Sequence, residues 1–163
     1  MKIRQVESKD IEKITNIYNW YILNTIITFE LAAIAPQEMA QRVKEKLKRH
    51  NWLVGEVDQD IIGYAYYGAF RPRPAYNHTI EATIYLAQDQ TGKGFGKALY
   101  GELIHSAKAQ NFREIMGVIA LPNAGSVKLH KSCGFEEAGV LKRAGYKFEK
   151  YIDVAIWQRS IYE

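Results

Sequence analysis

The 163-residue sequence contains a single cysteine, Cys133, which excludes a disulfide within the chain and any zinc site built from several cysteines. It contains no apolar run approaching the roughly 20 residues of a membrane-spanning helix. The N-terminal stretch MKIRQVESKD reaches charged residues before an apolar segment develops, unlike a secretory leader. No cluster of His, Cys, Asp or Glu has metal-site spacing, so we expect no metal. These absences predict a protein of the reducing cytoplasm with no membrane partner.

Positive charge is in slight excess, with a formal net charge of +4. The lysines and arginines are scattered, whereas a nucleic-acid surface needs them clustered with aromatic residues on one face. The excess suits an anionic small ligand and equally suits solubility alone. We therefore expect no nucleic-acid partner, and the length favours a single domain over residues 1–163.

Apolar spacing predicts both helices and strands. Pro36 stands at the first turn of a helical pattern, and Gly134 is placed to end a short helix. The polar link Asp58-Gln59-Asp60 between two apolar runs indicates a hairpin. The predicted helices cover 9–24, 36–49, the residues after the glycines up to about 111, and 123–133; the predicted strands lie in 51–57, 61–70, 78–86 and 114–120, with two more in 139–161.

This order, with helices first and strands after, predicts an α+β fold, or α/β in a looser scheme. We expect a mixed, mostly antiparallel twisted sheet with helices on both faces. The strand at 78–86, the glycine stretch, the following helix and the strand at 114–120 form a βαβ-like unit.

The stretch QTGKGFGKALY, residues 90–100, places glycines at 92, 94 and 96 immediately before a helical pattern. It is not a P-loop, because Thr91 replaces the first glycine and Ala98 the final Ser or Thr; it is not the dinucleotide fingerprint, because Lys97 replaces the third glycine. Successive N–H groups in a glycine turn before a helix still form an anion site. From spacing alone, an ordinary connecting turn is an equal alternative.

Taken together, several stretches resemble the GNAT superfamily of N-acetyltransferases, and within it the phosphinothricin and methionine sulfoximine or sulfone acetyltransferases. They follow in the family's order over nearly the whole chain. The matching stretches are ITFE at 27–30, GYAYYGAFRPRPAY at 63–76, TIEATIYL at 79–86, GKGFGKALY at 92–100, NAGSVKLHKSCGF at 123–135 and GYKFEKYIDV at 145–154.

The resemblance implies acetyl-CoA as cosubstrate, with its pyrophosphate on the glycine loop, a small-molecule amine as acceptor, and a homodimer. Asn123 and Ser126, which by resemblance contact the pantetheine arm, are alternatively no more than helix-capping residues. The cofactor-binding residues so implied are Leu86, Ala87, Gln88, Thr91, Gly92, Lys93, Gly94, Phe95, Gly96, Lys97, Asn123 and Ser126.

Two residues are candidates for catalysis. Glu81 lies opposite the apolar face of its strand, where burial would raise its pKa, although a solvated carboxylate is the alternative. By the resemblance, Glu81 is the base that removes a proton from the acceptor's ammonium group. His130 either protonates the leaving thiolate or assists the proton removal; alternatively, it only stabilises a helix C-terminus.

The acceptor pocket is also suggested by the resemblance. Arg71 and Arg73 stand in a loop with two prolines, and an arginine suits a carboxylate through bidentate hydrogen bonds. A solvated basic loop is the alternative there, as a surface lysine is for Lys147. The implied acceptor-binding residues are Phe29, Glu30, Arg71, Arg73, Tyr76, Tyr85 and Lys147.

The sequence thus predicts an enzyme that transfers acetyl from acetyl-CoA to the α-amine of a small amino-acid-like acceptor, of the phosphinothricin, methionine sulfoximine or methionine sulfone type. The amine would attack directly in a ternary complex. One alternative is the same fold acting on a polyamine, an aminoglycoside or a protein N-terminus, although the arginines of 71–76 do not suit a polyamine. The other is a non-catalytic CoA-binding module, which would tolerate loss of Glu81.

Overall fold

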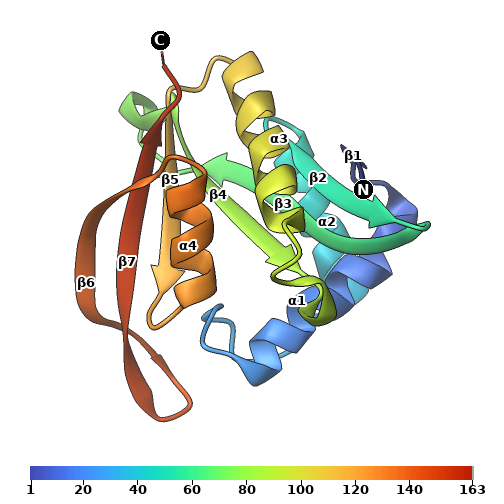
Figure 1. Ribbon diagram of the computed structural model, residues 1–163, viewed down its shortest axis with the longest axis horizontal. Coiled ribbons are helices and arrows are strands. Elements are labelled where there is room, and N and C mark those ends of the chain that lie inside the picture. The colour runs from blue at the N-terminus through green and yellow to red at the C-terminus, as the bar shows by residue number, and fades with distance from the viewer. Residues whose placement is uncertain (163) are drawn as a thin grey trace.

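The computed structural model describes residues 1–162 and arranges seven strands in one twisted sheet, in the order β1-β2-β3-β4-β5-β7-β6 (Figure 1). Neighbouring strands are antiparallel except β4 and β5, which are parallel and joined through α3. The strands are β1 (Lys2–Gln5), β2 (Trp52–Val57), β3 (Asp60–Ala69), β4 (Thr79–Leu86), β5 (Glu114–Ala120), β6 (Glu136–Lys147) and β7 (Lys150–Ser160). The helices are α1 (Ile11–Asn24), α2 (Pro36–Leu47), α3 (Phe95–Ala109) and α4 (Ala124–Ser132), with 3-10 turns η1 (Ser8–Asp10), η2 (Pro74–Tyr76) and η3 (Gln88–Gln90). Within residues 1–162, none of the helices is both long and apolar enough to cross a membrane.

The α+β class, the predicted helices and the strands from β2 to β7 are confirmed. Gly134 ends α4 with a φ of +77°, as expected, and the only cysteine, Cys133, is buried. The expectation that helices come first is wrong, because β1 precedes α1 and pairs with β2. Its four residues, KIRQ, include one apolar side chain and form an edge strand, so they carry no strand periodicity.

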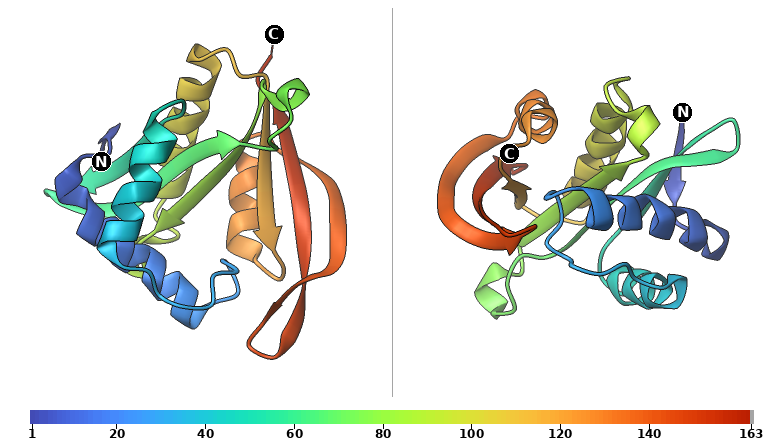
Figure 2. Two further views of the ribbon diagram at one scale, coloured as in Figure 1. Left: turned by 180° about the vertical axis from the view of Figure 1, so that it is seen from behind. Right: turned by 90° about the horizontal axis from the view of Figure 1, so that it is seen from below.

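The helices cover both faces of the sheet, with α1 and α2 on one side and α3 and α4 on the other (Figure 2). Because successive side chains of a strand point to opposite faces, β4 contributes to both cores. Tyr85 joins the core beneath α1 and α2, whereas Ile80 and Ala82 join the core beneath α3. β4 thus carries side chains into both cores, as β2 and β3 also do.

The sheet is open between β4 and β5. These strands pair only over Thr79–Ala82 and Glu114–Gly117. Beyond this register, both continue to Leu86 and Ala120 but diverge from each other (Figure 1). The separation leaves backbone edges unpaired in the middle of the sheet, where a ligand can meet them.

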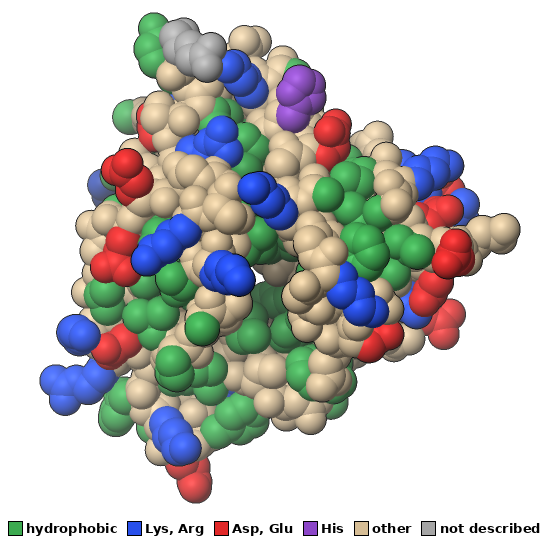
Figure 3. Space-filling view, viewed as in Figure 1, with side chains coloured by type: hydrophobic (Ala, Val, Ile, Leu, Met, Phe, Trp, Pro, Cys, Tyr) green, Lys and Arg blue, Asp and Glu red, His purple; other side chains and the backbone are tan. Residues whose placement is uncertain are grey.

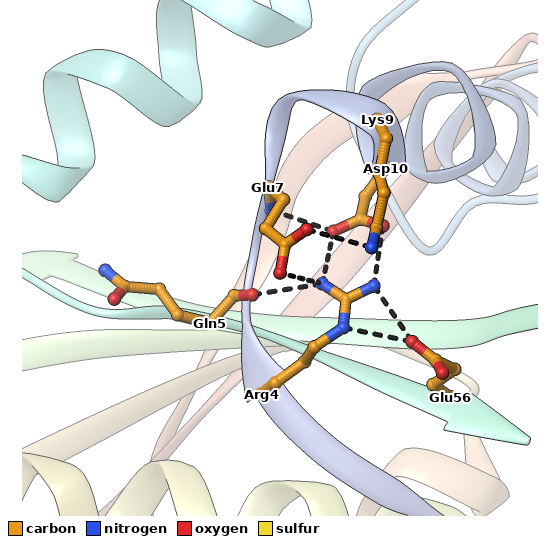
Figure 4. Close-up of polar contacts among 6 residues, drawn as sticks. All are labelled: Arg4, Gln5, Glu7, Lys9, Asp10 and Glu56. Atoms are coloured by element: carbon orange, nitrogen blue, oxygen red, sulfur yellow. Dashed lines mark hydrogen bonds and ion pairs between the residues drawn. The ribbon is translucent and has the colours of Figure 1, made fainter. Parts of the chain in front are cut away.

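At the β1 edge, Arg4 is the centre of a closed group of charges (Figure 4). Its guanidinium donates to the two carboxylate oxygens of Asp10, at 2.7 and 2.9 Å, and to Glu56 at 3.0 Å. The backbone N–H of Glu7 donates to Asp10 at 2.8 Å. Burial tends to raise the pKa of Asp10, but the hydrogen bonds from Arg4 and Glu7 outweigh it and hold the pKa below its usual value. This cluster ties the start of α1 to β1 and β2.

Candidate active site

A cavity of about 210 Å³ lies where β4 and β5 separate. The face that carries α3 and α4 has a hollow near its centre, with lysine and arginine side chains around it (Figure 3). Six residues predicted from the sequence line the cavity: Phe29, Glu81, Tyr85, Asn123, Ser126 and His130. The rest of the lining was missed by the sequence reasoning: Ile27, Thr28, Ala82, Thr83, Ile84, Val118, Ile119, Ala120 and Val154.

The cavity runs through the sheet, so its two ends carry different groups. Glu81 points to the α1 and α2 face, like Tyr85 on the same strand, whose ring centroid lies 5.1 Å from that of Tyr21. His130 lies on α4 at the opposite face, where a Cβ built on Gly117 of β5 would overlap its imidazole. A carboxylate and an imidazole therefore approach the same gap from opposite sides.

The Glu81 carboxylate is partly buried, and no residue within 1–162 donates a hydrogen bond to it. Burial raises its pKa, while the charge of Lys46 acts in the opposite direction. A carboxylate whose charge is only partly compensated takes up a proton more readily than one in water. Glu81 is therefore a stronger base than a carboxylate in water.

His130 is buried, and its hydrogen bonds define which nitrogen carries the proton. Nδ1 lies 2.8 Å from the carbonyl oxygen of Ser126, which can only accept, so Nδ1 donates. The Tyr100 hydroxyl then donates to Nε2, at 3.2 Å. Burial lowers the pKa of His130 and raises that of Tyr100 well above its usual value, so the pair stays imidazole and phenol near neutral pH. His130 is therefore arranged to accept a proton rather than to donate one.

The glycine loop leads into α3 as an open concave turn. Gly92 and Gly94 have φ of +74° and +86°, which favours glycine, and a Cβ built on either would meet no atom within 4 Å. Gly94 is the N-cap of α3, so the first-turn N–H groups of 95–97 have no partner within the helix. The exposed side chains of Lys93 and Lys97 add positive charge. The loop thus has the geometry and charge of an anion site.

Beside the loop, β4 offers a free backbone edge. Hydrogen bonds from the Ala87 N–H to Ile62 and from the Phe70 N–H to Thr79 show that the odd-numbered residues of β4 bond to β3. Ile84 therefore directs its N–H and C=O toward the gap, where β5 does not pair with it. This edge can bond the amide groups of an extended ligand as another strand would.

The predicted residues Leu86, Ala87 and Gln88 connect this edge to the loop. The Leu86 carbonyl accepts from the Tyr21 hydroxyl at 2.8 Å, and the Ala87 carbonyl accepts from the Gln90 N–H at 2.9 Å. These bonds position the start of the glycine loop and occupy part of the backbone that was expected to bind cofactor.

Asn123 and Ser126 lie at the opposite wall of the cavity. The Asn123 side chain accepts from the backbone N–H of Ser126 at 3.0 Å and caps the N-terminus of α4. The capping role that we considered is therefore present. Because both residues also line the cavity, the cap places their polar atoms within reach of a ligand there.

The α1–α2 loop closes the acceptor end of the cavity against β6. The buried ammonium group of Lys147 donates to the carbonyl of Thr28 at 2.8 Å. A Cβ built on Gly145 would overlap the ring of Phe29, so only a glycine lets this ring lie on β6. Burial lowers the pKa of Lys147, although the charge of Glu30 opposes this. Lys147 thus supports the cavity wall from behind and is not in its lining.

Four further residues predicted to bind the acceptor lie outside the lining: Glu30, Arg71, Arg73 and Tyr76. Glu30 forms an ion pair with Arg42 of α2 at 2.6 Å. The guanidinium of Arg71 lies over the ring of Tyr76, 5.8 Å from its centroid, and the side chains of Arg71 and Arg73 are exposed. The structure therefore does not bring the two arginines to the cavity within this chain.

Known proteins agree with this architecture. The chain is 36% identical over 160 residues to a phosphinothricin N-acetyltransferase of Streptomyces viridochromogenes, covering 98% of this chain and 87% of that protein. It is 30% identical to an L-methionine sulfoximine/L-methionine sulfone acetyltransferase of Pseudomonas aeruginosa, covering 98% and 94%. A crystal structure of a phosphinothricin acetyltransferase from Sinorhizobium meliloti, in complex with acetyl-CoA, matches with a TM-score of 0.95 at 36% identity, covering 98% and 87%. Residues 3–156 match the model of the acetyltransferase (GNAT) domain, and the chain therefore belongs to the GNAT family of acetyltransferases.

Proposed function

We propose that this chain transfers the acetyl group of acetyl-CoA to the α-amine of a small amino-acid-like acceptor. One observation carries the proposal: the cavity passes through the sheet, with Glu81 at one end and the open side of α3 and α4 at the other. The acceptor enters from the α1 and α2 face and the thioester from the face of the glycine loop. The names of the relatives suit acceptors such as phosphinothricin and methionine sulfone.

The residues present fit acetyl-CoA. The concave loop of 91–97 suits its pyrophosphate, because the glycines leave room and the helix N-terminus supplies N–H groups. The free edge of Ile84 suits the amide groups of the pantetheine arm, and Asn123 and Ser126 line the opposite wall. The thioester then lies in the gap between β4 and β5.

Glu81 takes a proton from the acceptor's ammonium group, directly or through a water, which frees the amine to attack. The amine nitrogen bonds to the thioester carbon and the carbon–sulfur bond breaks, and the leaving thiolate takes up the second proton that the nitrogen releases as it becomes an amide. His130, neutral and accepting at Nε2, assists the proton removal rather than protonating the thiolate.

Direct attack fits this site better than an acetyl-enzyme. Ser126 lies beside His130, with its Oγ 3.3 Å from Nδ1, but Nδ1 carries the proton that it donates to the Ser126 carbonyl. The ring therefore has no lone pair with which to activate that hydroxyl. Burial raises the pKa of the Cys133 thiol, which keeps it protonated.

The test is a screen of amines for release of CoA from acetyl-CoA. We expect turnover with phosphinothricin, methionine sulfoximine or methionine sulfone, and little with polyamines, aminoglycosides or peptide N-termini. Faster turnover of a polyamine or a peptide would contradict the proposed acceptor class, but the protein would still be an acetyltransferase. Release of no CoA with any amine would favour a binding module.

We also propose that the protein is a cytoplasmic homodimer. Val118 of β5 and Leu141 of β6 are 44% and 53% exposed on one face of the sheet, which no helix of residues 1–162 covers (Figure 2). A second copy packed on this face would remove both side chains from water. Light scattering after size exclusion measures the mass: a dimer is expected, and a monomer at micromolar concentration would contradict it.

A further inference from the structure

A cation that was not predicted from the sequence lies close to Glu81, on the side of the sheet where the acceptor is proposed to enter. Lys46 lies on α2, and its side chain reaches the sheet at β3. A Cβ built on Gly68 would overlap the Lys46 ammonium group, so this nitrogen occupies the space directly over Gly68. The same nitrogen lies 5.7 Å from the ring centroid of Tyr66, in a cation–π position.

This position makes the ammonium group a neighbour of Glu81. Gly68 is the residue directly opposite Glu81 in the β3–β4 register. Side chains of directly opposite residues begin about 4.5–5.5 Å apart, and the ammonium group occupies the place where the Gly68 side chain would begin. Lys46 is also the charge that acts on the Glu81 carboxylate. A positive and a negative group therefore stand side by side on one face of the sheet.

Lys46 is a partly buried cation without a carboxylate partner among residues 1–162. On the same helix Arg42 pairs with Glu30 and Glu38, and Lys48, just after the helix, pairs with Glu45 at 2.6 Å; Lys44 also forms no salt bridge there, but it is exposed to water. Within residues 1–162, Lys46 forms no salt bridge, and Glu81 likewise accepts no hydrogen bond. Both charges are thus left without a direct partner within the chain, in positions where a ligand can supply one.

We infer that Lys46 binds the carboxylate of the acceptor while Glu81 receives its ammonium group, so that the pair recognises an amino acid as a zwitterion. An α-amino acid carries its ammonium and carboxylate groups on the same carbon atom, which suits the position of the Lys46 ammonium group beside Glu81. The inference rests on the proposed function and adds to it the residue that selects amino acids over plain amines. It assigns to Lys46 the role that the sequence suggested for Arg73. Neither side chain is in the cavity lining itself, but the Lys46 ammonium group lies over Gly68, directly opposite Glu81, whereas Arg73 is exposed in its loop.

The test compares two enzymes on two acceptors that differ in one charge. The acceptors are methionine sulfone and its methyl ester, which keeps the amine but loses the carboxylate charge. Lys46→Met should lower kcat/KM for methionine sulfone by about ten- to a hundredfold, the range of a charge-assisted hydrogen bond. The value for the ester should change less than about threefold, and the KM of acetyl-CoA should not change. Lys46→Arg should restore part of the activity toward methionine sulfone.

Two further variants serve as comparisons. Lys44→Met removes a charge from an exposed position of the same helix and should leave both acceptors unaffected. Arg73→Ala should leave the discrimination between acid and ester in place. A thermal melt of each variant shows whether it is folded.

Three outcomes would overturn the inference. If Lys46→Met lowers kcat/KM equally for methionine sulfone and for its methyl ester, Lys46 acts on the base or the fold rather than on the acceptor's carboxylate. If Arg73→Ala removes the discrimination and Lys46→Met does not, the arginine binds the carboxylate. If wild-type protein acetylates neither acceptor and no related amino acid, the proposed function fails first and the inference with it.

Discussion

The buried carboxylate of Asp10 and the partly buried carboxylate of Glu81 have opposite surroundings. Asp10, at the β1 edge, is 3% exposed and receives hydrogen bonds from Arg4 and from a backbone N–H (Figure 4). Glu81, in the middle of the sheet, receives none from residues 1–162. The pKa of Asp10 is held below its usual value although burial opposes this, whereas burial raises that of Glu81.

The difference separates stability from catalysis. A carboxylate whose charge is fully satisfied stabilises the fold and has no tendency to bind a proton. A carboxylate left partly uncompensated costs stability, and the same cost makes it a base. The chain thus uses one carboxylate to fasten α1 to the sheet and, under the proposed function, another as a base at the gap in that sheet.

The largest effect is expected at the open site. Glu81→Gln keeps the shape of the side chain and removes its basicity, so kcat should fall by about 10²–10⁴ near neutral pH with little change in the KM of acetyl-CoA. Part of the rate should return at high pH, where solution supplies the free amine. Steady-state kinetics over pH 6–10 measure this. A near-normal kcat with an unaltered pH profile would make His130 the leading base.

At the closed cluster, a substitution should affect stability and not chemistry. Arg4→Met leaves the Asp10 charge buried without its main partner, so the free energy of unfolding should fall by about 2–4 kcal/mol. The melting temperature should then drop by roughly 5–15 °C. Lys9→Met is the control, because the Lys9–Glu7 pair is exposed to water and contributes little to stability. A fall in kcat of folded Arg4→Met protein would show that the two regions are coupled.

The glycine loop is a second place where polar groups, here backbone N–H groups, are left without a partner in the helix and can bind a ligand. Gly94→Asp places a negative charge where the pyrophosphate should bind, so the affinity for acetyl-CoA should fall by more than about tenfold while the fold persists. Gly94→Asn adds a similar side chain without the charge and separates strain from repulsion. Gly101→Asp makes the matched change within α3 and should leave affinity intact. Calorimetric titration with CoA provides the readout, and equal affinity in all three variants would remove the loop from the site.

The smallest expected effects are changes in stability when each carboxylate is replaced by its amide, and these changes have opposite signs for Asp10 and Glu81. The lowered pKa of Asp10 gives stability that is present above its unfolded pKa of about 3.9 and is lost as pH falls further. Asp10→Asn should therefore destabilise at pH 7 by about 1–3 kcal/mol and by less at pH 3.

The raised pKa of Glu81 means that its charge costs stability once pH rises above about 4.3. Glu81→Gln should raise the melting temperature by about 1–3 °C at pH 7 and leave it unchanged at pH 4. Melting curves at the two pH values test both signs, and a less stable Glu81→Gln protein at pH 7 would contradict the comparison.

Much of the fold could be predicted from the sequence because its elements have clear periods. The alternation around Glu81 marks β4, and the glycines before α3 mark the turn of the βαβ unit. Part of the candidate site could also be predicted, since six predicted residues line the cavity. β1 could not be predicted, because a short polar edge strand does not show alternating apolar and polar residues.

The division of the site between two faces could not be predicted. It depends on where the pairing of β4 and β5 stops, and hydrophobic pattern does not encode the end of a register. Lys46 likewise resembles any exposed lysine on an amphipathic helix, and only its overlap with the missing side chain of Gly68 distinguishes it. Arg73 carried the expected chemistry in a loop, whose course the sequence does not determine.

The bond from Lys147 to the carbonyl of Thr28 joins residues 119 positions apart. A ribosome delivers the α1–α2 loop early and the β6–β7 hairpin last, so during synthesis the Thr28 carbonyl lacks the Lys147 partner until the chain is almost complete. The strand, glycine loop and helices of 79–132 come from one contiguous stretch and can assemble before that. The order of synthesis therefore gives the nascent protein its glycine loop first, and the wall between the α1–α2 loop and β6 closes only when the final hairpin arrives.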